Sequence, residues 1–281
     1  ATTNDAIFTA KKNFGDWGVD GLLGGSIFYS KDNNLIANTV NGLSIPGFYS
    51  LRNSIDPAKA VESRVKEMRN GLYGRISLSW RNAIFLEATG RNDWVSTLTK
   101  DHRSYFYPSV SGSVVVTDLL PSKPLWLDMF KVRGSWAITK SVLNPYEINS
   151  TFTVTSNVWN GLPTASYPNI IKDYSISPTQ RDLTEFGFDF AVLNNRLYGN
   201  YTRYYRLLHN QIVKAKISKT TGFEERLINT KEEEMTKGHE ITLGGTPIKR
   251  ENFQWDITMN LSQNMRYFHK LDPQYSKDAL Y

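Results

Sequence analysis

Few side chains in this chain are spaced to carry out covalent chemistry. His239-Glu240 begins like the H-E-x-x-H motif of zinc peptidases, but Leu243 stands where the second zinc-binding histidine is required. The other three histidines are isolated in the sequence, and neither a G-x-S-x-G nucleophile elbow nor a phosphate-binding P-loop is present. The chain has no Cys, which excludes a thiolate nucleophile, a zinc-thiolate site and a disulfide framework. We therefore expect no metal, no cofactor and no enzymatic activity.

Glu185 and Asp189 are the best-placed pair of carboxylates. They are four residues apart in a segment of alternating polarity, so on a strand they share one face at a separation of about 13 Å. The two carboxylates of a glycosidase lie roughly 5 to 9.5 Å apart, so this spacing argues against a β-rich glycosidase. We expect Glu185 and Asp189, together with Lys131 and Arg133 on another segment, to be polar residues that face a lumen.

These residues belong to segments of about ten residues in which apolar and polar side chains alternate. Every second residue of the segment 252–263 is polar, and the face between them carries Phe253, Trp255, Ile257, Met259 and Leu261. A strand places successive side chains on opposite faces, so each segment of this kind predicts a strand with one apolar and one polar face.

Ten strands are predicted, and the lengths of their connections alternate. Their approximate ranges are 5–14, 17–29, 70–81, 83–91, 107–117, 128–139, 183–192, 196–209, 236–246 and 252–263. Tight turns are expected at Gly15-Asp16, at 81–83, at Asn194-Asn195 and within 247–252, and long connections follow the second, fourth, sixth and eighth strands. Short turns at one end and long loops at the other are typical of an up-and-down antiparallel sheet that crosses a membrane.

The composition is compatible with such a sheet. The 281 residues carry a net charge of +6 and contain no apolar run of the roughly 18–20 residues that a membrane-spanning helix needs. Strands of a transmembrane barrel need only about 9–11 alternating residues. The basic residues are scattered and the densest run, 231–237, also contains three Glu, so we expect no nucleic-acid partner.

Tryptophans are placed toward the ends of the predicted strands. Four lie within a few residues of a short connection and two lie near the opposite strand ends, namely Trp17, Trp80, Trp126 and Trp255, and Trp94 and Trp136. Two rows of amphipathic aromatic residues are typical of the interfacial girdles of a membrane barrel, so we expect lipid or detergent to cover the apolar faces.

One stretch departs from the alternating pattern. Asp56 is placed to cap a helix with Pro57 at its first position, and apolar residues follow at helical spacing as far as Met68. We expect a short helix or turn there, inside a long loop that runs from about residue 30 to 69. An early extension of the third strand is the alternative.

Five segments resemble the SusC/RagA family of TonB-linked outer-membrane transporters. The segment NGLYGRISLSWRNAIFLEATGRND, Asn70 to Asp93, is similar to a family strand, turn and strand that end in R-x-D before a loop. WLDMFKVRGSWAITK, Trp126 to Lys140, is similar to the family pattern l-d-x-l-K-l-R-g-S-y-G-x-T-g. Segments 105–120, 176–212 and 235–264 resemble further family patterns in the same order.

The resemblance implies a part of a large transmembrane barrel of the 22-stranded type with long extracellular loops. It implies import of oligosaccharides or peptides across the outer membrane of a Gram-negative, Bacteroidetes-like bacterium, together with a SusD-like surface lipoprotein and with TonB. The chain shows no plug region, TonB-contacting box or C-terminal barrel strands, so we expect residues 1–281 to be a segment of one barrel domain.

The long loops hold the candidate contacts to a substrate or to the lipoprotein. They are rich in aromatic, Asn and Arg residues, which suit sugar or peptide ligands, and the candidates are Trp94, Arg103, Tyr105, Trp159, Tyr167 and Tyr174. The Pro and Asn between Asn144 and Pro178 favour an ordered, irregular loop over an added pair of strands. Residues 140–180 are expected to touch the partner or the substrate.

A different function class is compatible with the same alternation. A soluble or surface-attached β-sheet module that binds glycans without transport would also alternate apolar and polar residues. Such a module has to bury its apolar face against a second sheet, whereas a transporter wall leaves that face to lipid. Where the apolar faces lie therefore discriminates between the two.

Overall fold

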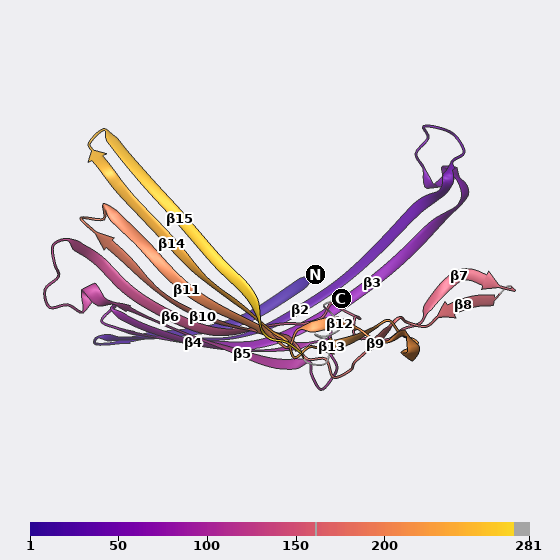
Figure 1. The fold of residues 1–281 in the computed structure, drawn as a ribbon, viewed down its shortest axis with the longest axis horizontal. Helices are drawn as coiled ribbons and strands as arrows, with labels where there is room; N and C mark the ends of the chain where they lie inside the picture. The colour runs from indigo at the N-terminus through magenta and orange to yellow at the C-terminus, as the bar shows by residue number, and fades with distance from the viewer. Residues whose placement is uncertain (161, 273–281) are drawn as a thin grey trace.

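The chain folds into one curved, ten-stranded antiparallel sheet whose strand order follows the chain, apart from five short strands in its long connections (Figure 1). The computed structural model describes residues 1–160 and 162–272, without the side chains of 155–159. The sheet strands are β1 (Thr2–Phe14), β2 (Trp17–Leu43), β3 (Ser54–Trp80), β4 (Ile84–Val95), β5 (Ser104–Val115), β6 (Leu127–Ser141), β10 (Thr179–Val192), β11 (Leu197–His209), β14 (Glu233–Arg250) and β15 (Phe253–Lys270). All ten predicted strands and their up-and-down order are confirmed.

Short elements fill the connections. They are the 3-10 turns η1 (Leu51–Asn53), η2 (Val116–Asp118) and η3 (Lys219–Thr221), and the strands β7 (Thr153–Trp159), β8 (Leu162–Ser166), β9 (Ile170–Lys172), β12 (Ile212–Lys216) and β13 (Glu225–Asn229). No helix among the described residues is both long and apolar enough to cross a membrane.

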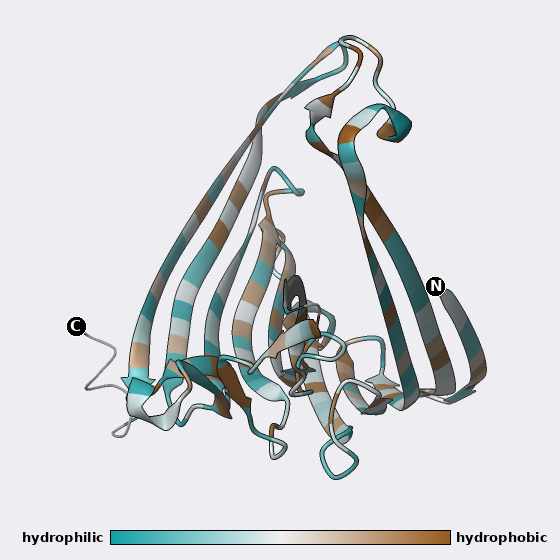
Figure 2. Cartoon of the chain, turned by 90° about the vertical axis from the view of Figure 1, so that its right-hand side faces the viewer, coloured by the Kyte–Doolittle hydropathy of each residue, from teal (hydrophilic) through white to brown (hydrophobic). Residues whose placement is uncertain are grey.

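The register gathers the apolar side chains on one face of the sheet. Phe188 of β10 lies opposite Val132 of β6 and Tyr201 of β11, and all three belong to that face. This face has no covering layer in the described structure, so Phe186 is 58% exposed and Met259 is 55% exposed. Figure 2 shows the resulting bands of apolar and polar residues across the curved sheet. A module with two packed sheets does not have this arrangement, so the soluble-module alternative loses its support.

The polar face is the concave one. Its side chains line two open hollows of about 430 and 460 Å³, and Thr202 and Glu234 on this face are each only 8% exposed although no second sheet covers them in the described structure. The convex side of the sheet is therefore the apolar one, as the wall of a membrane barrel requires.

Tight turns gather at one end of the sheet. Gly15, Asn82, Asn194 and Asn195 all have φ between 53° and 59°, the left-handed conformation in which Gly and Asn are tolerated best. Next to these turns, Trp17 and Trp80 lie with ring centroids 6.3 Å apart, and Trp255 is 50% exposed near the β14–β15 turn. The predicted row of tryptophans at the turn end is therefore present.

The predicted helix near Asp56 is wrong, and the alternative of an early third strand is right. Strands β2 and β3 pair from Trp17–Trp80 out to Leu43–Ser54, so most of the expected loop 30–69 is a two-stranded ribbon. The ribbon projects beyond the rest of the sheet (Figure 1). Pro57 falls at a register irregularity between the Asn38–Lys59 and Val40–Asp56 pairs, where no ladder hydrogen bond from its nitrogen is needed.

The connection between β6 and β10 also differs from the expected irregular loop. It contains an added pair of strands, β7 and β8, and the short strand β9, which joins β13 in a parallel pair. The preference for an irregular loop over added strands was wrong, because Asn157 and Pro163 lie within β7 and β8 without preventing their pairing, which has a register irregularity between Thr155 and Val158.

Candidate functional site

The polar face of the sheet carries paired charges along its strands. Arg133 of β6 donates a hydrogen bond to the Thr202 hydroxyl at 2.6 Å, and its Nε lies 3.6 Å from a carboxylate oxygen of Asp189. Lys131 and Glu185 line the same open hollow of about 430 Å³ as Arg133. The register thus places the four residues predicted to face a lumen on one face and within reach of one another.

A second group of charges continues this face toward β2. Arg75 of β3 lies 2.6 Å from Asp20 of β2 and 3.7 Å from Glu87 of β4. Each of these charges is about a third exposed, so solvent weakens the attraction within each pair. Such charge pairs can form hydrogen bonds with a polar ligand. Because each charge is already partly neutralised by its partner, they do not bind a strongly charged ligand tightly.

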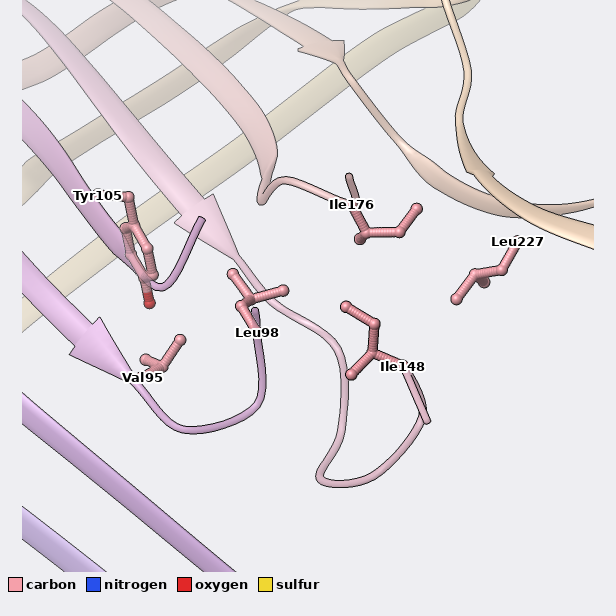
Figure 3. Packing of buried hydrophobic residues seen from close by; sticks show 6 residues of the cluster. All are labelled: Val95, Leu98, Tyr105, Ile148, Ile176 and Leu227. Atoms are coloured by element: carbon pink, nitrogen blue, oxygen red, sulfur yellow. The ribbon is translucent and has the colours of Figure 1, made fainter. Parts of the chain in front are cut away.

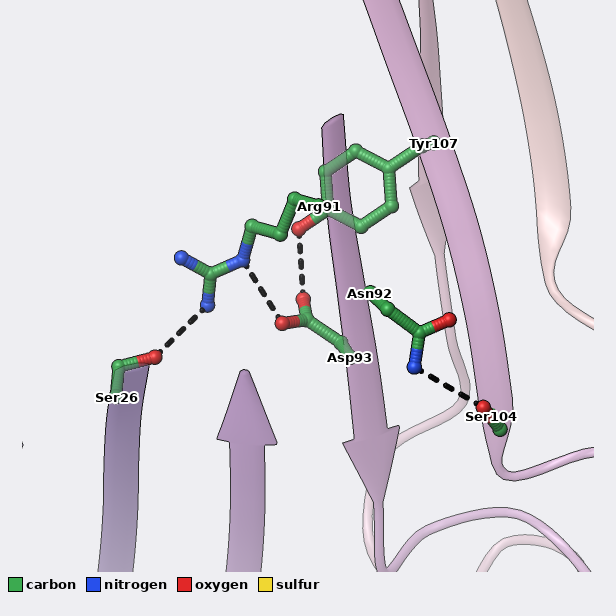
Figure 4. Close-up of polar contacts among 6 residues, drawn as sticks. All are labelled: Ser26, Arg91, Asn92, Asp93, Ser104 and Tyr107. Carbon is green, nitrogen blue, oxygen red and sulfur yellow. Dashed lines mark hydrogen bonds and ion pairs between the residues drawn. The ribbon is translucent and has the colours of Figure 1, made fainter. Parts of the chain in front are cut away.

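Asp93 is the most buried charge on this face, at 4% exposure (Figure 4). Its carboxylate accepts hydrogen bonds from Arg91 Nε at 2.8 Å and from the Tyr107 hydroxyl at 2.7 Å. Arg91 also donates to the Ser26 hydroxyl at 3.2 Å, so the contacts reach from β2 to β5. The R-x-D motif of the sequence places Arg91 and Asp93 on one strand face, and the buried carboxylate is satisfied by both neighbours.

Gly71 makes room for this network between β2 and β4. A Cβ at this position would lie 2.6 Å from Arg91 Nη2, 2.6 Å from Asp93 Oδ1 and 2.7 Å from Ser26 Oγ. Only a residue without a side chain therefore lets the guanidinium and the carboxylate meet over β3.

The long connections share a small apolar core at the other end of the sheet from the turns (Figure 3). Six side chains exposed by 7% or less form it, drawn from four separate stretches of sequence: Val95, Leu98, Tyr105, Ile148, Ile176 and Leu227. This core anchors the connections that follow β4, β6 and β11 to one another. Tyr105, a candidate ligand contact, is buried here, and its ring packs against the core instead of facing solvent.

Three aromatic side chains form an exposed patch beyond this core, which we call the rim aromatic patch: Phe152, Tyr167 and Phe223. The Tyr167 ring centroid lies 5.1 Å from that of Phe152 and 5.6 Å from that of Phe223, in edge-to-face arrangements. Together with Ile170 and Pro168 they line a hollow of about 170 Å³. Tyr167 was predicted as a contact residue, whereas Phe152 and Phe223 were missed because no local pattern joins residues 71 positions apart.

The other loop candidates are separated. Trp94 and Arg103 line one hollow of about 520 Å³ at the end of β4, and Trp94 belongs to the apolar face. Tyr174 is 61% exposed and lines a different hollow with Tyr146. Trp159 ends strand β7, and its side chain lies outside the described residues.

Asp173 joins the β6–β10 connection to the β11–β14 connection. Its carboxylate accepts hydrogen bonds from the Ser175 hydroxyl and backbone nitrogen at 2.7 and 2.9 Å, and from Arg226 of β13 at 3.1 Å. The two bonds from Ser175 and then the Arg226 charge lower the pKa of Asp173 below its usual range. Near neutral pH this carboxylate is therefore a fixed negative charge that ties two loops together.

The described residues of the polar face and of the rim offer hydrogen-bonding and aromatic groups to which a ligand can bind. In the part of the chain that the structure describes, no three His, Asp or Glu side chains gather as metal ligands would. On the polar face, Asp20, Asp93 and Asp189 each pair with an Arg side chain.

Comparisons with known proteins agree with the sheet and its sequence. TonB-dependent receptor P26 of Formosa agariphila is 23% identical over 255 residues, which cover 86% of this chain and 25% of that protein. TonB-dependent receptor SusC of Bacteroides thetaiotaomicron is 25% identical over 230 residues, or 76% of this chain and 22% of that protein. The sequence is thus similar to TonB-dependent receptors, SusC among them. No protein-family model matches the chain.

Solved structures show the same fold. The RagAB peptide transporter superposes with a TM-score of 0.82 at 17% identity, over 96% of this chain and 30% of that one. The outer membrane transporter YddB from Escherichia coli gives a TM-score of 0.61 at 13% identity, over 95% of this chain and 34% of that one. The segment spans about a quarter of the length of the curated relatives it matches.

Proposed function

We propose that the receptor to which this segment belongs imports oligosaccharides or peptides across the outer membrane of a Gram-negative, Bacteroidetes-like bacterium. The observation that carries the proposal is the two-faced wall: ten strands with a lipid-compatible convex face and a concave face of paired charges. Such a wall encloses a polar path and performs no covalent step. Residues 1–281 contribute part of one barrel domain, and TonB acts through a plug region of the full receptor.

The concave face supports a passive role in passage. Several of its charges are paired, as in Arg133–Asp189 and Arg75–Asp20, and these partly neutralised groups offer weak hydrogen-bonding sites along the face. A path of this kind favours release as much as binding, which transport needs. Lys131, Arg133, Glu185 and Asp189 are proposed to face the lumen.

The rim supports a role in capture. Ile148 and Ile176 anchor the β6–β10 connection in the apolar core, while the β7–β8 hairpin between them carries exposed residues such as Phe152 and Tyr167. Exposed aromatic side chains on an anchored loop are suited to sugar rings, peptide side chains or a protein partner. We propose that this connection contacts the substrate or a SusD-like surface lipoprotein, and that Trp94, Arg103, Trp159 and Tyr174 lie on the same extracellular side.

The turn end is proposed to face the periplasm. Irregular backbone in lipid leaves amide groups without partners, so long connections have to lie in water. The tight turns at Asn82 and Asn194-Asn195, next to the tryptophan row, need little space outside the membrane and are placed on the periplasmic side. The loops that contain Trp94 and Phe223 then face the outside.

Deletion of residues 149–168 in the full-length receptor tests this function. It removes the β7–β8 hairpin but leaves the anchors Ile148 and Ile176, so we expect normal insertion and weaker binding of the lipoprotein or slower uptake. Insertion is measured by heat-modifiable migration and import by growth on the cognate nutrient. Unchanged lipoprotein binding together with unchanged uptake would contradict a role for this connection.

A further inference from the structure

Two cations and a histidine form a cluster on the apolar face, where lipid would be expected. Arg203 of β11 lies opposite His239 of β14, and Lys237 is the next residue on that face of β14. Arg203 Nη1 contacts His239 Nε2, and the Tyr201 hydroxyl lies 2.5 Å from His239 Nδ1. We call Arg203, Lys237 and His239 the outward basic cluster.

The cluster has aromatic neighbours and no acidic partner. The Arg203 guanidinium lies 4.8 Å from the centroid of the Tyr205 ring, and Lys237 Nζ lies 5.1 Å from that of Tyr267. Among the described residues, no carboxylate pairs with either cation. The acidic groups of neighbouring strands that share the apolar face have partners of their own, Asp182 with His209 and Glu233 with Lys270.

The position of the cluster on the wall is defined by the register. Apart from residues beside the turns themselves, such as Lys12 of β1 and Arg250 of β14, the first charged residue on the apolar face counted from the turn end is Lys66 on β3, Lys140 on β6, Asp182 on β10 and Arg203 on β11. Along this series of strands, each of these residues lies in a row of paired residues closer to the tight turns than the residue before it. Barrel strands are tilted, so a boundary parallel to the membrane crosses these rows obliquely and meets each successive strand at a different row. These residues therefore mark one edge of the band that lipid covers.

A cation on the lipid-facing side is costly at the middle of a bilayer and tolerated near its surface. At that surface, tyrosines and cations meet the phosphate groups of lipids. By contrast, β4 and β5 place no charged residue on the same face. The cluster is therefore a local concentration of positive charge without a protein counter-ion, at the depth of the headgroups.

We propose that Arg203, Lys237 and His239 bind the phosphate of an anionic membrane lipid on the outside of the wall. The two side chains with permanent charge attract the phosphate, and the histidine, oriented by Tyr201, supplies a further hydrogen-bonding nitrogen. Tyr205 and Tyr267 hold the two cations toward the headgroup layer. The proposal concerns the lipid-facing surface and is independent of which nutrient the receptor imports.

The test uses the full-length receptor in detergent, with lipid binding counted by native mass spectrometry. The probes are lipid A and lipid A from which both phosphates have been removed, and inorganic phosphate is added as a competitor. The outward double variant carries Arg203→Gln and Lys237→Gln. The control double variant carries Lys11→Gln and Arg181→Gln, which remove the same amount of charge from the polar face.

We expect the outward double variant to weaken lipid A binding by about tenfold to thirtyfold. Each Lys or Arg near an anionic headgroup raises the affinity by about fivefold, and the two contributions multiply. The control pair should bind lipid A within about twofold of wild type, and wild type and the outward variant should bind dephosphorylated lipid A within about twofold of each other, more weakly than wild type binds lipid A. Millimolar inorganic phosphate should compete only weakly if the whole lipid is the ligand, and strongly if free phosphate is.

Equal binding of lipid A by wild type and the outward variant would overturn the proposal. It would also be overturned if both forms of lipid A bind equally, or if the variant instead splits a dimer, which would make a second copy the occupant. If the Gln variant does not insert, Arg203→Lys with Lys237→Arg keeps both charges and should retain lipid A binding. Loss of binding in that inserted variant would also contradict a site based on charge.

Discussion

Asp93 and Tyr107 are diagonal neighbours across the β4–β5 ladder, and the Tyr107 hydroxyl donates a 2.7 Å hydrogen bond to the buried carboxylate. The same carboxylate receives Arg91 from two residues away on its own strand. The contact lies directly below the loop core that contains Tyr105. It thus connects the polar wall to the rim on which capture is proposed to depend.

Removal of the Asp93 carboxylate should destabilise this junction. In Asp93→Ala, Arg91 and Tyr107 lose their shared acceptor, and we expect a loss of about 1–3 kcal/mol in the free energy of unfolding. Tyr107→Phe removes one of the two hydrogen bonds and should cost about 1 kcal/mol. Urea unfolding of the full-length receptor in detergent measures both, and an Asp93→Ala variant as stable as wild type would show that the network contributes nothing.

Gly71 provides a matched pair of substitutions. Gly71→Ala places a methyl group 2.6 Å from Asp93 Oδ1, so the network has to separate and stability should fall by about 1–3 kcal/mol. Gly25→Ala on the neighbouring strand meets its nearest atom at 3.8 Å and should change stability by less than about 0.5 kcal/mol. Equal unfolding midpoints for the two variants would contradict the packing described here.

Asp173 makes the rim sensitive to acid. Its pKa is lowered in the folded protein, so its stabilising contribution is complete above the usual carboxyl pKa of about 3.9 and is lost as the pH falls through the lowered value. We expect pepsin to cut the connection 169–178 faster at low pH in wild type. Asp173→Asn retains an acceptor for Ser175 but not the charge that attracts Arg226, and it should lose most of this pH dependence. An identical acid response in both proteins would rule out Asp173 as its origin.

Tyr167 connects the two other rings of the rim aromatic patch. Tyr167→Ala should release both Phe152 and Phe223 and lower substrate or lipoprotein affinity by about tenfold if the patch binds either one. Tyr167→Phe keeps the ring contacts and should retain most of the affinity. Isothermal titration with the purified lipoprotein and with the cognate nutrient separates the two ligands, and wild-type affinity of Tyr167→Ala for both would exclude the patch.

The buried side-chain amide of Asn53 makes three of the hydrogen bonds that hold the tip of the β2–β3 ribbon. Asn53 donates to the carbonyl oxygens of Ile45 and Phe48 at 2.8 Å and accepts from the Ile45 nitrogen at 3.0 Å. Asn53→Ala should therefore speed hydrogen exchange at residues 44–50 by more than about tenfold while exchange in the wall strands stays unchanged. Unchanged exchange at the tip would mean that the loop is ordered by other contacts.

The sequence predicts the wall well and the rim poorly, for a physical reason. A strand such as β15 reveals itself by alternation, because one of its faces is apolar and the other polar. The ribbon beyond Tyr29 is exposed on both faces without a regular apolar side, so alternation fades and Asp56-Pro57 resembles the start of a helix. Tyr105 and Tyr167 look alike in sequence, but contacts from distant loops bury one and leave the other exposed.

The alternation between lipid exposure and water exposure of successive side chains along β10 tests the central claim most directly. Residues 1–281 contain no native Cys, so single cysteines can be placed at Glu185, Phe186, Phe188 and Asp189 of the full-length receptor, with any other cysteine replaced, and spin-labelled in lipid vesicles. Labels at Phe186 and Phe188 should be quenched by oxygen, which dissolves in lipid, and labels at Glu185 and Asp189 by a water-soluble nickel chelate. A pattern without this alternation, or with the two pairs exchanged, would contradict a wall that turns its apolar face to the membrane and its charges to a lumen.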